Sequence, residues 1–349
     1  MPPIFKINDR SIGFGQKSYI IAEMSANHDQ SFNKAVKIIE AAKEAGADAV
    51  KLQTYTPDTI TIDCDNKHFR IKGTIWEGQT LYKLYKQAFT PWEWHSKLKQ
   101  VAETLGIALF SSPFDLSAVD FLESINVPAY KVASFEIVDL PLLRKIARSR
   151  KPILISTGMA NKGEIEEAVN TIRKEGNDQL ALLKCTSAYP APPGEINLRT
   201  IPHMAKTFGL PVGLSDHTLG SVVAVAAVCL GAHIVEKHFT LSRNDPGPDS
   251  SFSMEPHEFK QMVSDIRTVE VALGKVTYQI TERQKDSSVF RRSLFVVNDI
   301  KGGGYFTEEN VRSIRPGNGL HTRYLDMILG RRARREIPRG TPLSWKDVG

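Results

Sequence analysis

The chain has 349 residues, of which 41% are hydrophobic and 24% charged, and its formal net charge is +6. These proportions are typical of a globular protein, and the length suits an α/β barrel followed by a small further domain. Part of the positive charge lies in a C-terminal run without interleaved aromatic residues, formed by Arg331, Arg332, Arg334, Arg335 and Arg339. Such a run is typical of a solvated surface, so we expect no nucleic-acid partner.

Cysteine usage and apolar content indicate the compartment. Cys64, Cys185 and Cys229 lie far apart and form no Cys-x-x-Cys pair, which favours a reducing environment over a disulfide framework. The first ten residues contain no apolar signal segment, and the longest apolar run, Val222–Leu230, is too short to span a bilayer. We therefore expect a soluble, cytoplasmic protein without a membrane partner.

Short apolar stretches alternate with helical patterns along the first 274 residues. Eight stretches are predicted to be strands: Tyr19–Ala22, Ala47–Leu52, Ile107–Phe110, Ala129–Val132, Pro152–Ile155, Leu180–Leu183, Pro211–Leu214 and Ala232–Val235. Ser31 and the segment Thr90–Glu93 are predicted to cap two of the helices, and Pro256–Leu273 is the closing helix. This pattern predicts a (β/α)8 barrel, the TIM-barrel fold, over residues 1–274. An open doubly wound sheet is the alternative, but no Gly-x-Gly-x-x-Gly follows the first strand.

One connection is much longer than the others. The insertion Thr54–Phe89 separates the second strand from the next helix and exceeds the length of an ordinary strand-to-helix loop. We expect it to form a lid or wall at a functional site.

Two histidines follow the last two strands. The seventh strand runs into Ser215-Asp216-His217 and the eighth into Glu236-Lys237-His238, and the helix between them predicts that these strands are parallel and adjacent. Two histidines cannot close a structural zinc site, which needs four ligands. A metal ion held by them would therefore keep open positions, which favours catalysis. A hydrogen-bonded structural role for each histidine is the alternative.

Polar residues stand at the carboxyl ends of all eight predicted strands. They are Glu23, Lys51, Gln53, Ser112, Lys131, Ser156, Lys184, Thr186, His217 and His238, and Ser134 and Ser215 lie on the same rim. Lys51 and Lys131 lie on strands of a closed barrel, which has no edge where a lysine could reach water. Burying them is costly unless they are paired or bind an anion. The lysines and serines together predict a pocket for a small, phosphorylated substrate.

The composition changes after Gly274. Residues 275–288 are polar and are predicted to be a linker, and residues 289–349 a second domain too small for a deep core. A short strand is predicted at Phe290–Val297, a helix after Thr307, and a sharp turn at Arg315–Gly319.

Several motifs are specific in combination. They are Glu23–His28 (EMSANH), Tyr130–Ser134 (YKVAS), Ser156–Met159 (STGM), Gly213–Thr218 (GLSDHT), Glu236–Phe239 (EKHF), Pro246–Asp249 (PGPD) and Arg315–Gly319 (RPGNG). With them, essentially the whole chain resembles the sialic acid synthase family, the phosphoenolpyruvate-dependent nonulosonate synthases. The resemblance implies a barrel followed by an antifreeze-like (SAF) domain, and an enzyme that condenses phosphoenolpyruvate with the open-chain aldehyde of an acetamido sugar.

The resemblance also implies roles for individual residues. His217 and His238 match ligands of a divalent metal ion, Mn²⁺, Mg²⁺ or Co²⁺, and Glu23 matches or neighbours the acid/base group. The residues that contact phosphoenolpyruvate in the family correspond here to Lys51, Lys131, Ser112, Ser134, Ser156 and Ser215. The residues that contact the sugar in the family correspond here to Gln53, Tyr189, Glu236, Asp249 and Arg315. Ser187, also expected to contact the sugar, replaces the asparagine of the sialate-type Asn-x-Tyr motif, which argues against N-acetylmannosamine.

Within the family, the segments Gly73–Trp76, Leu81–Tyr85 and Thr90–His95 resemble members that act on 2,4-diacetamido-2,4,6-trideoxy-L-altrose. An apolar wall for the methyl group of that 6-deoxy sugar is predicted from Trp76, Phe114, Phe135 and Tyr189. Synthases of N-acetylneuraminate or legionaminate are the alternatives. A carbohydrate-binding or ice-binding protein is an alternative of another class, but a binding module needs no paired lysines opposite a metal site.

The resemblance further implies a homodimer with exchanged domains. The predicted linker is long enough to carry the small domain to a partner's barrel, and two-fold dimers are the commonest assembly. Arg315, with Phe290 nearby, is then expected to complete the partner's site. Capping of the same chain's own barrel is the alternative.

Overall fold

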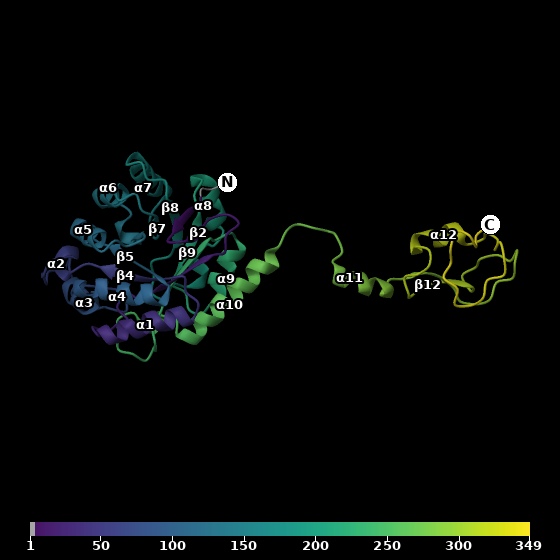
Figure 1. Cartoon of the computed structure of the whole chain (residues 1–349), viewed down its shortest axis with the longest axis horizontal. Coiled ribbons are helices and arrows are strands. Elements are labelled where there is room, and N and C mark those ends of the chain that lie inside the picture. The colour runs from purple at the N-terminus through teal and green to yellow at the C-terminus, as the bar shows by residue number, and fades with distance from the viewer. Residues whose placement is uncertain (1–3) are drawn as a thin grey trace. The chain divides into compact units, whose positions relative to one another are not determined.

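The computed structural model describes residues 4–349 and divides into two compact units, Met1–Gly274 and Lys275–Gly349. The first unit is a closed barrel of eight parallel strands, in the order β10-β3-β4-β5-β6-β7-β8-β9 (Figure 1). The predicted (β/α)8 fold is therefore confirmed.

All eight predicted strands are present within two or three residues of their expected ends. They are β3 (Tyr19–Glu23), β4 (Ala49–Thr54), β5 (Ala108–Pro113), β6 (Tyr130–Val132), β7 (Ile153–Ser156), β8 (Leu180–Cys185), β9 (Val212–Asp216) and β10 (Ile234–His238). All of these strands except β6 extend further toward their carboxyl ends than the apolar stretches did, because the polar residues there belong to the strands. Glu23, Gln53 and His238 are examples.

Helices surround the barrel. They are α1 (Phe32–Glu44), α2 (Pro57–Ile60), α3 (Leu81–Ala88), α4 (Trp92–Leu105), α5 (Leu116–Ser124), α6 (Leu140–Arg148), α7 (Lys162–Lys174), α8 (Thr200–Phe208), α9 (Val222–Cys229) and α10 (Pro256–Leu273). The closing helix α10 packs against α9 and α1 on the outside of the barrel (Figure 1). Among the helices of residues 4–349, none combines the length and the apolar character needed to cross a membrane.

The predicted helix caps can be compared with the observed helix starts. The Ser31 hydroxyl accepts a hydrogen bond from the Lys34 N–H, so Ser31 caps α1 as predicted. The prediction for Thr90 was wrong: Pro91 occupies the cap position of α4, and no side chain caps that end. The Thr90 hydroxyl instead lies 3.1 Å from Nε2 of His28, and both side chains are buried.

A hairpin that the sequence analysis overlooked precedes the barrel. Its strands β1 (Phe5–Ile7) and β2 (Arg10–Ile12) are antiparallel. Phe5, Ile7 and Ile12 belong to the same buried cluster as residues that begin the barrel strands, such as Tyr19 and Ala49. The hairpin therefore packs at the amino-terminal end of the barrel, opposite the polar strand ends.

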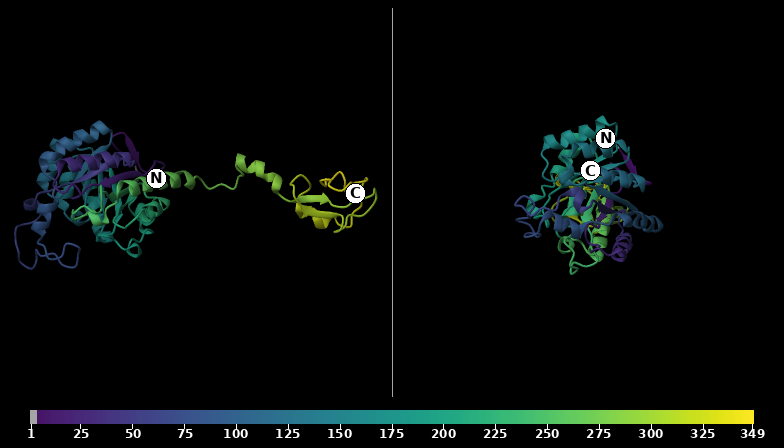
Figure 2. Two further views of the ribbon diagram at one scale, coloured as in Figure 1. Left: turned by 90° about the horizontal axis from the view of Figure 1, so that it is seen from below. Right: turned by 90° about the vertical axis from the view of Figure 1, so that its left-hand side faces the viewer.

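The insertion Thr54–Phe89 contains α2, α3 and an outer loop that projects from the barrel (Figure 2). Segments 69–71 and 79–81 of this loop pair with each other: the Ile71 N–H donates to the Gln79 carbonyl at 2.9 Å, and Arg70 and Thr80 form an antiparallel bridge. The residues between these segments form the insertion tip, Lys72–Gly78, which is held at both ends.

The second unit contains α11 (Glu282–Asp286), β11 (Ser293–Val296), β12 (Val311–Ile314) and α12 (Leu325–Ile328). The predicted linker 275–288 therefore includes a short helix. The helix predicted after Thr307 is absent from the described chain: the Thr307 N–H donates to Oδ1 of Asn310, which closes a turn that leads into β12.

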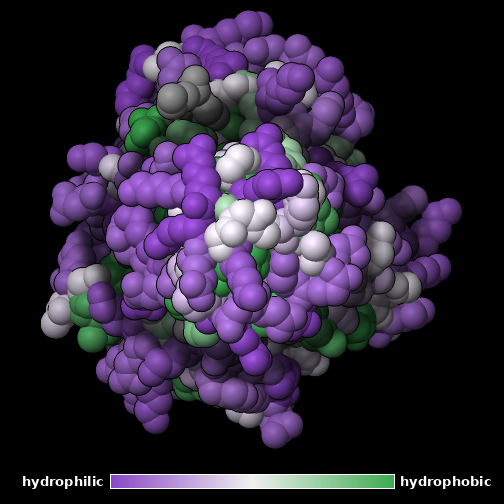
Figure 3. Space-filling model, turned by 90° about the vertical axis from the view of Figure 1, so that its right-hand side faces the viewer, coloured by the Kyte–Doolittle hydropathy of each residue, from purple (hydrophilic) through white to green (hydrophobic). Residues whose placement is uncertain are grey.

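The second unit has a small core of its own, with Leu294, Val296 and Phe306 among ten buried hydrophobic residues. All five arginines of the C-terminal run are exposed, as expected for a solvated surface. Most of the residues visible in Figure 3 are hydrophilic.

Candidate active site

Four charged side chains meet inside the carboxyl end of the barrel. Nζ of Lys51 lies 2.6 Å from Oε2 of Glu23 and 3.6 Å from Oε1 of Glu236. Nζ of Lys131 lies 3.6 Å from the same Glu236 oxygen. All four residues are at most 5% exposed. A buried network of this kind is costly to fold compared with an apolar core, which indicates a functional reason for it.

Serine hydroxyls surround the two lysines. Lys51 donates to the Ser112 hydroxyl at 3.3 Å, and Lys131 donates to that of Ser156 at 2.7 Å. Ser215 donates to Oε1 of Glu236 at 3.2 Å, and the Ser134 hydroxyl accepts from the Gly158 N–H at 3.1 Å. The structure thus places the predicted lysines and serines around one space, where their N–H and O–H groups can bind an anion.

Burial and neighbouring charges set the protonation of this cluster. Burial raises the pKa of Glu23 to about 7, although Lys51 favours the ionised form. Burial also acts to raise the pKa of Glu236, but Lys131 and Lys51 outweigh it and hold that pKa below its usual value. Burial lowers the pKa of Lys131. Glu23 is therefore the carboxyl suited to exchange a proton near neutral pH, while Glu236 stays ionised.

A second polar group lies beside Glu23. Gln53 donates to Oε1 of Glu23 at 3.0 Å and to the Ser25 hydroxyl at 2.9 Å, and Ser25 in turn donates to Asp249. Burial raises the pKa of Asp249. This chain of hydrogen bonds connects the loop after β10 with β3 and β4. It brings two of the predicted sugar contacts, Gln53 and Asp249, next to the lysine cluster.

His217 and His238 face each other, with ring centroids 5.4 Å apart. Nδ1 of His217 donates to the Thr186 carbonyl at 2.9 Å, which leaves Nε2 as the ring's free lone pair. Nδ1 of His238 is buried and finds no hydrogen-bond partner among residues 4–349. Each imidazole therefore offers one nitrogen to a ligand.

This pair fits a divalent ion that takes its other ligands from water or substrate. No group of three His, Cys, Asp or Glu side chains in residues 4–349 is placed to hold an ion by itself. Such an ion would keep the open positions that a catalytic site requires.

Aromatic rings form one side of the mouth. The Tyr189 ring lies 4.3 Å from that of His217 and 5.8 Å from that of Trp76, measured between centroids. The predicted apolar wall is only partly assembled, because Phe114 packs 5.2 Å from Tyr55 instead and Phe135 is 58% exposed.

A cleft of about 490 Å³ opens beside Tyr189. Gly73–Trp76 of the insertion tip line one part of it, and Ser187–Pro190 of the loop after β8 line the other. Ser187, predicted to contact the sugar, therefore lies at this cleft.

Glu136 is a further acidic residue near the lysines that the sequence analysis missed. It follows β6 in the turn Ser134–Glu136, and burial raises its pKa to about 7, although Lys131 acts to lower it. Its Oε2 is buried and has no hydrogen-bond partner in the described chain. The sequence contained one signal for this role: Glu136 follows Ser134, a predicted rim residue, by two positions.

Arg315 and Phe290 belong to the second unit. Both are exposed, and they are close to each other because the Gly317 N–H donates to the Val289 carbonyl at 2.9 Å. The two residues predicted to cover the partner's active site therefore lie close together on the small domain.

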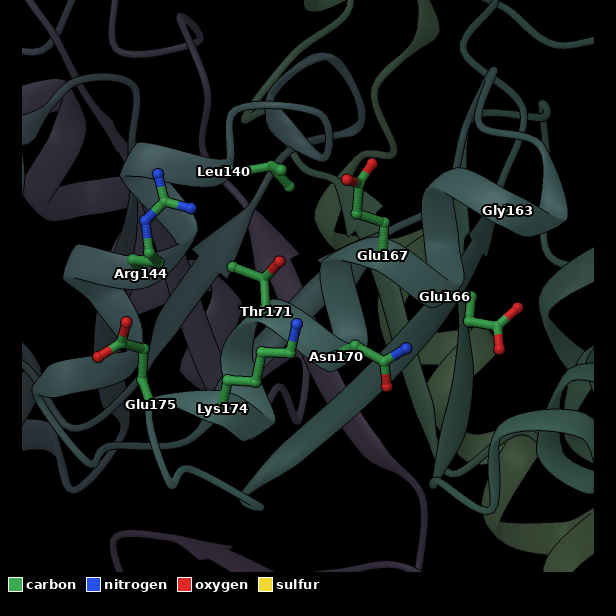
Figure 4. A pocket seen from close by; sticks show the side chains of 9 residues that line it. All are labelled: Leu140, Arg144, Gly163, Glu166, Glu167, Asn170, Thr171, Lys174 and Glu175. Atoms are coloured by element: carbon green, nitrogen blue, oxygen red, sulfur yellow. The ribbon is translucent and has the colours of Figure 1, made fainter.

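A different hollow lies outside the barrel between α6 and α7 (Figure 4). Arg144, Lys174 and Glu175 are among its nine lining residues, none of which is buried. Solvated side chains of both charges make it a surface groove, whereas the strand ends hold buried charges with free hydrogen-bonding atoms.

Comparisons with known proteins agree with this geometry. The profile of the NeuB family matches residues 38–278, and that of the SAF domain matches residues 291–349. The chain belongs to the NeuB family. Its resemblance to sialic acid synthases is thereby confirmed, and so is the antifreeze-like nature of its C-terminal domain.

NeuB relatives match nearly the full length of the chain. A pseudaminic acid synthase of Helicobacter pylori is 45% identical over 95% of this chain and 98% of its own length. An N,N'-diacetyllegionaminic acid synthase of Campylobacter jejuni is 40% identical over 90% of this chain and 96% of its own length. The crystal structure of the spore coat polysaccharide biosynthesis protein SpsE of Bacillus subtilis has a TM-score of 0.69 at 35% identity and covers 99% of both chains.

Proposed function

We propose that this NeuB-family protein is a pseudaminic acid synthase. It condenses phosphoenolpyruvate with 2,4-diacetamido-2,4,6-trideoxy-L-altrose and water, and it releases pseudaminate and phosphate. The observation that carries the proposal is the buried set of Lys51, Lys131, Glu23 and Glu236 beneath the paired histidines, in a chain 45% identical to a pseudaminic acid synthase.

Phosphoenolpyruvate binds at the two lysines. Its phosphate and carboxylate accept hydrogen bonds from Lys51 and Lys131 and from the hydroxyls of Ser112, Ser134, Ser156 and Ser215. The negative charges of phosphoenolpyruvate add to those of Glu23 and Glu236, which are the anionic partners of the two lysines among residues 4–349. The lysines and serines are already desolvated and oriented in the folded protein, so they need little reorganisation when the anion binds.

The sugar aldehyde lies nearer to the histidines. Gln53, Tyr189, Glu236 and Asp249 are proposed to orient it, with Ser187 at the outer side. Oε2 of Glu236 is buried without a partner among the described residues, so it can accept a hydrogen bond from a sugar hydroxyl. His217 and His238 would hold Mn²⁺, Mg²⁺ or Co²⁺, which supplies Lewis-acid stabilisation of the charge that develops on the aldehyde oxygen.

The electrons move in three steps. The double-bond pair of phosphoenolpyruvate forms the new bond from its methylene carbon to the aldehyde carbon, and the aldehyde oxygen gains a proton. Water then adds to the electron-poor C2 and loses its proton to a carboxyl group. Finally the C2–O bond to phosphate breaks, phosphate leaves with the electron pair, and the C2 hydroxyl loses its proton to give the ketone. Glu23 and Glu136, each with a pKa near 7, are the proposed carriers of these protons.

The small domain is proposed to cover the site in a homodimer. Arg315 and Phe290 of each chain would contact the sugar bound in the partner's barrel, so that bulk water is excluded and only the reacting water molecule reaches C2. A cytoplasmic location remains a prediction.

The proposal is tested by phosphate release from phosphoenolpyruvate with a panel of acetamido sugars. We expect the highest kcat/KM with 2,4-diacetamido-2,4,6-trideoxy-L-altrose. A higher value with N-acetylmannosamine or with the legionaminate precursor would assign the protein to one of the two alternative synthases. No phosphate release with any acetamido sugar would reject the enzyme class.

A further inference from the structure

The insertion tip is held in a defined place next to the mouth of the barrel. The pairing of segments 69–71 and 79–81 fixes its two ends. Trp76 fixes its middle, because its indole Nε1–H donates to the Pro248 carbonyl at 3.1 Å. Pro248 adjoins Asp249, which is tied to Ser25, so the tip is linked through one loop to the centre of the site.

The cleft between the tip and the loop after β8 begins one aromatic ring away from the histidines. Tyr189 contacts His217 on one side and Trp76 on the other, and Trp76 and Tyr189 both line the cleft. A substrate whose aldehyde lies at His217 and His238 would therefore extend past Tyr189 into this space. The volume of about 490 Å³ is in the range of small-molecule sites.

The lining of the cleft is amphipathic. Ile75 and the rings of Trp76 and Tyr189 are apolar, whereas Thr74 and Ser187 contribute hydroxyls that can donate and accept hydrogen bonds. Ile75 is 53% exposed, so a ligand in the cleft can cover its side chain. An acetamido group has the matching chemistry: a flat amide with one donor and one acceptor, and a methyl group.

We propose that the insertion tip, through Ile75 and Trp76, is the specificity element that binds the acetamido group at C4 of the sugar. The proposal rests on the proposed function and deepens it. The C2 acetamido group, adjacent to the reacting carbon, would bind inside the mouth. The C4 group, two carbons further out, reaches the cleft. Members that act on sugars without a C4 acetamido group would not need this contact.

The test compares substitutions in the tip with a matched control. Ile75→Ala and Ile62→Ala remove the same atoms from exposed isoleucines of the same insertion, 53% and 59% exposed, but only Ile75 lines the cleft. Trp76→Phe keeps the aromatic face and removes the hydrogen bond to Pro248, whereas Trp76→Ala removes both.

For each variant, kcat/KM is measured with the diacetamido sugar and with N-acetylmannosamine, together with the KM for phosphoenolpyruvate and the melting temperature. We expect Ile75→Ala to lower kcat/KM for the diacetamido sugar about tenfold and Trp76→Ala about 30-fold or more. With N-acetylmannosamine the loss should stay below about threefold, and the KM for phosphoenolpyruvate should not change. Ile62→Ala should behave as the unmodified protein.

Two results would overturn the proposal while leaving the proposed function intact. One is an equal loss with both sugars. The other is unchanged discrimination in Ile75→Ala and Trp76→Ala when both are folded. If the unmodified protein itself prefers N-acetylmannosamine, the proposed function fails first and the role of the tip in binding a C4 acetamido group fails with it.

Discussion

Nζ of Lys51 lies 2.6 Å from Oε2 of Glu23, and the two residues are direct neighbours in register on β4 and β3. Neither side chain can reach water, because both are almost fully buried. Each charge is therefore tolerated only in the presence of the other, and the pair connects the stability of the barrel with the chemistry of the site.

Lys51→Met should reveal this dependence on pH. Removing the cation leaves the Glu23 carboxylate buried without its partner, a loss of about 3–5 kcal/mol when the carboxyl is ionised. Because burial already raises the pKa of Glu23 to about 7, protonation relieves the loss at lower pH. Urea unfolding should therefore show a larger destabilisation at pH 8 than at pH 6.

The double variant Lys51→Met/Glu23→Gln is the control. It should recover stability at pH 8 because no buried charge remains at this pair, yet it should release no phosphate. If the single variant were equally destabilised at both pH values and the double variant no more stable, the Lys51–Glu23 pair would not be the cause.

Chelation should abolish activity without unfolding the protein. His217 and His238 lie at the ends of strands that the barrel already holds, so an ion bound there contributes to catalysis rather than to folding. After treatment with a chelator, phosphate release should stop, and the far-UV circular dichroism and the melting temperature should hardly change. Added Mn²⁺, Mg²⁺ or Co²⁺ should restore activity. If His217→Ala remained fully active after chelation, the metal assignment would be wrong.

Acid should destabilise the packing around α4 through His28, which lies against Trp94, and His95, which lies against Phe121. Both histidines are buried, and burial lowers each pKa to about 4 from its ordinary value of 6.5. Between these values the unfolded state binds more protons than the folded state, so stability falls as the pH decreases from about 6.5 to about 4. Each histidine should contribute about 3 kcal/mol to this loss.

His95→Gln isolates that contribution. Glutamine can still bond to the Thr54 hydroxyl, 2.8 Å from Nε2 of His95, but it does not titrate. The free energy of unfolding, measured by urea between pH 7 and pH 4.5, should decrease less steeply in this variant than in the unmodified protein. Parallel pH profiles would show that His95 does not titrate on unfolding.

Exchange of domains is tested by mixing two inactive variants, Glu23→Gln in the barrel and Arg315→Ala in the small domain. If each small domain covers the partner's barrel, heterodimers contain one site without a lesion. After subunit exchange, about one quarter of all sites should be intact, because half of the dimers are mixed. If each domain covers its own barrel, every site keeps a lesion and the mixture stays inactive. A mixture of Glu23→Gln with His217→Ala, two barrel variants, should stay inactive in either case.

The sequence indicated the barrel well because its strands are apolar and end in polar residues. The same polar residues located the centre of the site: the structure brings Lys51, Lys131 and the two histidines to one end of the barrel. The distances between these side chains and their pKa values depend on the residues that bury them from all sides. A local sequence pattern carries no information about those residues.

Elements that depend on long-range contacts were harder to predict. The β1–β2 hairpin has strands of only three residues, and its side chains are ordered by the barrel they pack against. Thr90 has the sequence of a helix cap, but its hydroxyl bonds to His28, 62 positions away. Glu136 looks like an ordinary surface glutamate until the fold buries it near Lys131.

The hairpin has a consequence for the order of events in a reaction. Phe5, Ile7 and Ile12 cover the amino-terminal end of the barrel, and side chains fill its interior, so a substrate reaches the buried charges from the carboxyl ends of the strands. Everything that enters or leaves must use that end of the barrel. A molecule seated as deep as Lys131 has to arrive before one that rests against Tyr189, and it cannot depart while the outer one is in place. The molecule that binds first can therefore leave only after the outer molecule has left.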